Sequence, residues 1–104
     1  MEIDFFDDSI EKFIQSLEKS TIAKVLRSID LLAEFGHSLG LPHTKKIAPN
    51  LFELRIRSAQ EVRIFFTIKD NRAILLHGFI KKSMKIPRRE IAAAQARLKH
   101  LDAI

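Results

Sequence analysis

The chain has 104 residues and a formal charge of +5, and this length predicts a single domain spanning residues 1–104. It contains no cysteine, which excludes disulfides, thiolate catalysis and thiolate metal sites. No apolar run approaches the roughly 18 residues of a membrane-spanning helix, and the acidic first four residues are unlike a signal peptide. We therefore expect a cytoplasmic protein.

The charge is distributed unevenly along the chain. Residues 1–40 carry four basic and eight acidic side chains, whereas residues 41–104 carry fourteen basic and five acidic ones. A basic segment of this kind favours a polyanionic partner, and nucleic acid is the first candidate.

The acidic first part predicts a short strand and two helices. Residues 3–6 suit a strand, and residues 7–9 offer several side chains that cap helix N-termini. Apolar residues then recur at helical spacing in two segments, which are separated at residues 20–21 and end at Gly36. Two helices joined so closely are expected to form an antiparallel hairpin that covers the apolar face of a sheet.

Residues 51–82 contain three runs in which apolar and polar residues alternate, as in half-buried strands. The apolar positions are even-numbered in all three runs. One sheet face is therefore expected to be apolar, and the other to carry charged and aromatic residues. The expected apolar set is Phe52, Leu54, Ile56, Val62, Ile64, Phe66, Ile68, Ile74, Leu76 and Ile80.

The shared even numbering also predicts how the strands pair. The apolar faces coincide only if the numbers of paired residues sum to an even value, which requires turns with an odd number of residues. We therefore predict three-residue turns at residues 58–60 and at residues 70–72.

These turns place Arg55 opposite Arg63, Arg63 opposite Phe79, and Phe65 opposite His77 on one face. Like charges opposite one another destabilise a sheet, so we interpret the arginine pair as a binding site for an anion. The alternative interpretation is that these residues are solvated side chains on an ordinary sheet face.

The end of the chain predicts a third helix, because Pro87 suits a first helical turn and apolar residues follow at helical spacing. The sequence has no glycine-rich phosphate loop, no nucleophile elbow and no spaced metal-ligand motif. We therefore expect neither a metal nor a cofactor.

Basic side chains beside aromatic rings suit RNA, because cations neutralise phosphate and rings stack on unpaired bases. RNA also carries its own nucleophile, the 2′-hydroxyl. Cleavage then needs an oriented hydroxyl, a base, an acid and stabilisation of charge on the phosphate. Arginine suits the last task, and lysine or histidine suits proton transfer.

Four segments resemble the RelE/ParE superfamily of bacterial type II toxins, and more narrowly its phage-derived, HigB-like branch. They are LFELR at 51–55, VRIFF at 62–66, LLHGFIKK at 75–82 and KIPRREIAAA at 85–94, with Arg97 following. The resemblance implies an α+β fold in which an N-terminal helical hairpin packs on a small twisted antiparallel sheet of three to four strands. A C-terminal helix follows the sheet.

The resemblance also implies an activity and residues that perform it. It implies a ribosome-dependent, metal-independent endoribonuclease that cleaves mRNA in the ribosomal A site and arrests translation. Arg63 and Arg55 are expected to hold the scissile phosphate, and Lys81, Lys82 and His77 to transfer protons. The further expected RNA contacts are Arg57, Lys45, Lys46, Lys85, Phe65 and Phe79.

The chain departs from the family pattern in one respect, because many RelE-type toxins place a tyrosine near the reaction centre and this chain has none. The implied partners are mRNA and a cognate antitoxin of helix-turn-helix, HigA-like type, with operator DNA contacted only through the antitoxin. No membrane partner is expected. Two alternatives remain open: a ParE-like inhibitor of DNA gyrase without nuclease activity, and a non-catalytic RNA-binding module.

Overall fold

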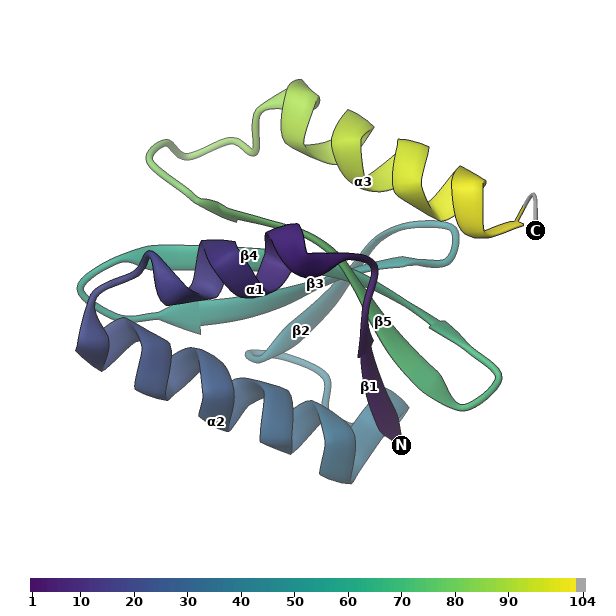
Figure 1. Ribbon diagram of the computed structural model, residues 1–104, viewed down its shortest axis with the longest axis horizontal. Helices are drawn as coiled ribbons and strands as arrows, with labels where there is room; N and C mark the ends of the chain where they lie inside the picture. Colours follow the sequence, from purple (N-terminus) through teal and green to yellow (C-terminus); the bar gives the residue numbers. More distant parts are fainter. Residues whose placement is uncertain (103–104) are drawn as a thin grey trace.

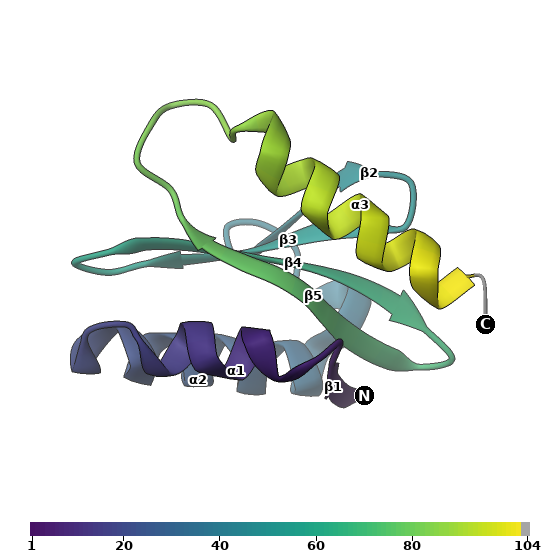
Figure 2. The same cartoon turned by 45° about the horizontal axis from the view of Figure 1, so that its top comes forward.

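A central sheet separates two helical layers, with the first two helices on one face and the last helix on the other (Figures 1 and 2). The computed structural model describes residues 1–102. In chain order the elements are β1 (Glu2–Phe5), α1 (Asp8–Gln15), α2 (Lys19–Phe35), the 3-10 turn η1 (Gly36–Ser38), β2 (Thr44–Ala48), β3 (Leu51–Arg57), β4 (Glu61–Lys69), β5 (Arg72–Ile80) and α3 (Arg88–Asp102).

The sheet has five strands in the order β1-β5-β4-β3-β2. Strand β1 pairs with β5 in parallel, whereas the other neighbours are antiparallel. The prediction of a three- to four-stranded antiparallel sheet is therefore wrong. It missed β2 because the lysine pair Lys45-Lys46 interrupts the alternation of apolar residues in a segment rich in turn signals.

The predicted helical hairpin is present only loosely. Helices α1 and α2 lie beneath the same sheet face (Figure 2), but α1 packs chiefly on β5 and α2 on β3. The Asp7 carboxylate caps α1 by accepting a hydrogen bond from the Ser9 backbone N–H at 2.9 Å. A further hydrogen bond from the Ser9 hydroxyl holds the pKa of Asp7 below its ordinary value.

The register of β3 and β4 is as predicted. Arg57 pairs with Glu61 around the three-residue turn at 58–60, and Arg55 lies opposite Arg63. The second turn differs, because Lys69 pairs with Arg72 and only residues 70–71 form the turn. Both turn residues have positive φ, of 53° and 59°, which a two-residue hairpin of type I′ requires.

A β-bulge compensates for this shorter turn. Phe66 pairs with Leu75 but Phe65 pairs with His77, so Leu76 is an extra residue in β5. The bulge restores the predicted pairing of Arg63 with Phe79. Between the turn and the bulge, the residues of β5 lie on the sheet face opposite to the predicted one. The prediction that Ile74 and Leu76 share the face of Phe66 is therefore wrong.

Two apolar cores therefore form, one on each side of the sheet. The larger core lies between the sheet and α1–α2, and it contains Ile10, Val25, Leu54, Ile64, Phe66 and Leu75 among others. The smaller core lies under α3 and contains Leu51, Phe65, Leu76, Phe79 and Ala94. No helix within residues 1–102 combines the length and apolar character needed to cross a bilayer.

The third helix is fixed to the sheet by a polar contact as well as by this core. Arg97 Nη1 donates a hydrogen bond to the Leu76 carbonyl oxygen at 2.6 Å. Its guanidinium also lies over the Phe6 ring, 5.3 Å from the ring centroid, which suits a cation–π interaction. The extra residue of the bulge thus supplies the acceptor that holds α3.

The close packing of α1 on β5 gives a test of this fold. A methyl group added at Gly78 would lie 2.6 Å from the Phe13 ring. We therefore expect Gly78→Ala to lower the free energy of unfolding by about 1–3 kcal/mol, because the ring must leave its position. Urea denaturation measures this, and Phe13→Leu in the same chain should recover part of the loss. A fully stable Gly78→Ala protein would contradict the described packing.

Candidate functional site

A basic depression lies where β3, β4 and the end of β5 meet. Strands β3 and β4 bring Arg55 and Arg63 opposite each other. The Lys81 backbone N–H donates to the Glu61 carbonyl oxygen at 2.7 Å, which holds the segment after β5 beside the start of β4. The depression is open to solvent and encloses about 610 Å³; its lining residues are Arg55, Arg57, Glu61, Arg63, Lys81, Lys82, Ser83 and Met84.

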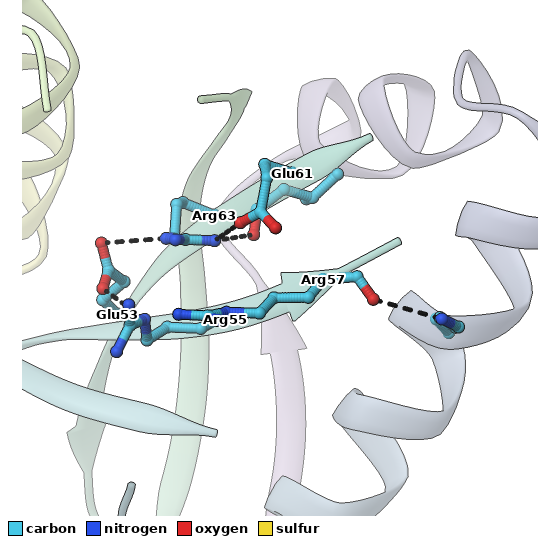
Figure 3. Close-up of polar contacts among 7 residues, drawn as sticks. Glu53, Arg55, Arg57, Glu61 and Arg63 are labelled. Carbon is cyan, nitrogen blue, oxygen red and sulfur yellow. Dashed lines mark hydrogen bonds and ion pairs between the residues drawn. The ribbon is translucent and has the colours of Figure 1, made fainter. Parts of the chain in front are cut away.

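A buried carboxylate bridges the two opposing arginines (Figure 3). Glu53 Oε1 lies 3.5 Å from Arg55 Nε, and Glu53 Oε2 lies 3.5 Å from Arg63 Nε. Glu53 is 3% exposed and Arg63 is 2% exposed. The repulsion between the arginines is thus relieved within the protein, so the opposition of Arg55 and Arg63 does not by itself indicate a bound anion.

Arg63 has a second carboxylate partner at the rim of the depression. Its Nη1 lies 3.0 Å from Glu61 Oε2 and 3.1 Å from the Val62 carbonyl oxygen. The Glu61 side chain is 41% exposed, in contrast to that of Glu53. The alternation of residues along the strand did not reveal either carboxylate as a partner, although Glu53 lies on the same face as Arg55 and Arg63.

The depression retains a surplus of positive charge. Its five cations, together with Glu53 and Glu61, leave a formal excess of three positive charges. Three buried atoms are also without a hydrogen-bond partner among the described residues, namely Arg55 Nε, Arg63 Nε and Glu53 Oε2. Buried polar atoms are normally satisfied by hydrogen bonds, whereas here the 3.5 Å ion pairs of Glu53 with the two arginines provide the compensation. The arrangement suits an anionic ligand with several oxygen atoms.

The structure separates His77 from this depression. His77 Nε2 lies 3.1 Å from Glu90 Oε1 in the first turn of α3, and the His77 ring stacks beside Phe79. His77 is therefore placed to hold α3 against the sheet, and the expected proton-transfer role has no support from its position.

The aromatic rings expected to stack on bases are also unavailable. Phe65 is fully buried and Phe79 is 6% exposed, because α3 covers this part of the sheet. Their prediction as RNA-contacting residues is wrong for this reason. Met84, which the sequence argument did not use, lines the depression and is 94% exposed.

The remaining predicted lysines lie apart from the depression. Lys45 pairs with Glu53, and Lys46 with Phe52, along the outer strand β2. Both lysines line a separate hollow with His37, and Lys85 is exposed in the segment before α3.

A further hollow of about 520 Å³ lies between α2 and the end of β3. It shares Arg55 and Arg57 with the depression and adds Lys24 and Arg27 from α2. Lys24 Nζ donates to the Arg57 carbonyl oxygen at 3.2 Å. The strand pattern gave no indication of this neighbour, because Lys24 lies in a helix and precedes Arg57 by 33 positions.

The structural assignment of His77 can be tested directly. We expect His77→Leu to lower the free energy of unfolding by about 1 kcal/mol, because leucine cannot form the contact with Glu90, and to speed amide exchange in α3. Binding of inorganic phosphate to the depression should be unchanged. Loss of phosphate binding in a folded His77→Leu protein would contradict this assignment and place His77 in the phosphate site.

Comparisons with known proteins identify the family. No curated protein matches the chain. One chain of the crystal structure of the heterotetrameric YoeB–YefM toxin–antitoxin complex from Staphylococcus aureus is similar, with a TM-score of 0.54 and 19% identity. That match covers 72% of this chain and 90% of the other, and it shows a shared fold. The family model described as phage-derived protein Gp49-like (DUF891) matches residues 12–99. The protein therefore belongs to the phage-derived Gp49-like family.

Proposed function

We propose that this protein is the toxin of a type II toxin–antitoxin system, of the HigB-like branch, and that it cleaves mRNA on the ribosome. The observation that carries the proposal is the open depression in which Arg55, Arg63, Lys81 and Lys82 converge. The family, and the fold shared with a chain of a toxin–antitoxin complex, give independent support.

In the proposed reaction the 2′-oxygen of the RNA attacks the adjacent phosphorus and the bond to the 5′-oxygen breaks. The products are a 2′,3′-cyclic phosphate and a free 5′-hydroxyl. Arg63 and Arg55 bind the phosphate and stabilise the negative charge that develops on it. Lys81 and Lys82 at the rim manage the two protons, one leaving the 2′-hydroxyl and one arriving at the 5′-oxygen.

We propose Met84, in place of the aromatic rings expected from the sequence, as the side chain that contacts an RNA base. Its thioether is an exposed apolar group beside the cations of the depression. Methionine makes favourable contacts with aromatic rings and adapts to their shape. We propose that it contacts the base next to the scissile phosphate, with little preference among bases.

The proposed partners follow from the proposed activity. The substrate is mRNA in the ribosomal A site, which places the protein in the cytoplasm. The cognate antitoxin is an HigA-like helix-turn-helix protein that alone contacts operator DNA.

Arg63→Lys tests the nuclease proposal. It retains the charge beside Glu53 and Glu61 but removes the planar fork that binds phosphate through two donors. We expect a folded protein whose cleavage of ribosome-bound mRNA falls about 100- to 1,000-fold, the typical loss when one charge-stabilising donor is removed. Mapping of 5′-hydroxyl ends measures it. Arg72→Lys is the matched control, because Arg72 pairs with Glu2 and Asp4 at the far strand β1.

Three results would contradict the proposal. Full cleavage by folded Arg63→Lys would show that the reaction does not need the Arg63 guanidinium. DNA breaks with intact mRNA would favour a gyrase inhibitor. RNA binding without cleavage by the wild-type protein would favour a binding module.

A further inference from the structure

Two carboxylates contact different atoms of the same guanidinium, and they differ in accessibility. Glu53 faces the Nε atom of Arg63, and Glu61 faces the Nη1 atom (Figure 3). The Glu53 side chain is 4% exposed and the Glu61 side chain is 41% exposed. The two carboxylates therefore carry the same charge in different environments, since one is buried and the other is exposed.

Glu53 lies where an incoming ligand does not reach. Its two oxygens face Arg55 and Arg63 separately, each at 3.5 Å from an Nε atom. Without the Glu53 carboxylate, the two guanidinium groups would repel each other, and their side chains would be free to move apart. Glu53 therefore holds the two guanidinium groups close together through charge, without a hydrogen bond to either Nε atom.

Glu61 occupies the side of Arg63 that faces the depression. It is the first residue of β4, and its exposed carboxylate lines the depression together with Lys81 and Lys82. The pair joins a buried guanidinium, 3% exposed, to a carboxylate that is 41% exposed, so Glu61 can turn into solvent when another anion takes its place. A phosphate offers more oxygens than a carboxylate and forms stronger paired contacts with arginine.

We propose that the Glu61 carboxylate occupies the ligand's place on Arg63 in the free protein and is displaced by the phosphodiester. Glu53, in contrast, is a positioning residue that stays in place. The inference depends on the proposed function for the identity of the ligand. It adds that the Glu61 carboxylate occupies the free site, so that Glu61 lowers ligand affinity whereas Glu53 raises it.

The experiment is a titration of the whole protein with inorganic phosphate, and with a dinucleotide that lacks the 2′-hydroxyl at its phosphate. Arginine Nε–Hε signals in NMR spectra report on Arg55 and Arg63 directly. We expect Glu61→Gln to tighten binding about two- to fivefold, because the variant lacks the charged carboxylate that competes with the ligand for Arg63. We expect Glu53→Asp to weaken binding about tenfold or more, as when a group that orients a ligand is altered.

Glu53→Asp keeps the charge and shortens the side chain by one methylene, so it separates position from net charge and keeps a partner for the buried arginines. Glu34→Gln is the control for charge, because Glu34 is exposed near the far end of α2. This control should bind as the wild type does. Unaltered backbone amide spectra verify that each variant is folded.

Unchanged or weaker binding by folded Glu61→Gln would overturn the displacement. Wild-type affinity in folded Glu53→Asp would overturn the positioning role. If the wild-type protein bound neither probe and its Arg63 signal stayed fixed, the anion site itself, and with it the proposed function, would fail. The two failures are therefore distinguishable.

Discussion

The site depends on one carboxylate placed between two guanidinium groups. Strand pairing puts Arg55 opposite Arg63, and such a pair destabilises a sheet unless it is compensated. Glu53 provides the compensation from the same strand as Arg55, two residues earlier. Because all three groups are held by adjacent strands, the positive charge stays concentrated at one end of the sheet. The two lysines after β5 then add positive charge to a site whose arginines are already held in place.

The two layers of helices explain why that end of the sheet remains open. Helices α1 and α2 cover one face, and α3 covers the part of the other face that contains Phe65, Leu76 and Phe79. The contacts of Arg97 with Leu76 and of His77 with Glu90 fix α3 in that position. Apolar and basic halves therefore share one sheet face, and α3 covers only the apolar half.

The sequence predicted the strands and the pairing around Arg63 because period-two alternation constrains the register tightly. The prediction of a longer second turn was wrong, yet the bulge at Leu76 added the missing residue and the pairing of Arg63 with Phe79 remained correct. Burial of Phe65 was not predictable from alternation, which shows the face of a residue but not where a later helix crosses it. The same limit concealed the contact between His77 and Glu90.

The central claim is that Arg63 and Arg55 form one phosphate site around an unmoved Glu53. The most direct measurement is a crystal structure of the protein with a dinucleotide that lacks the 2′-hydroxyl at its phosphate. The account predicts the phosphate in the depression, with its oxygens on the Arg63 guanidinium and Glu53 still between the two Nε atoms. A phosphate bound elsewhere, for example in the hollow beside Lys24 and Arg27, with Arg63 contacting only its two glutamates, would contradict it.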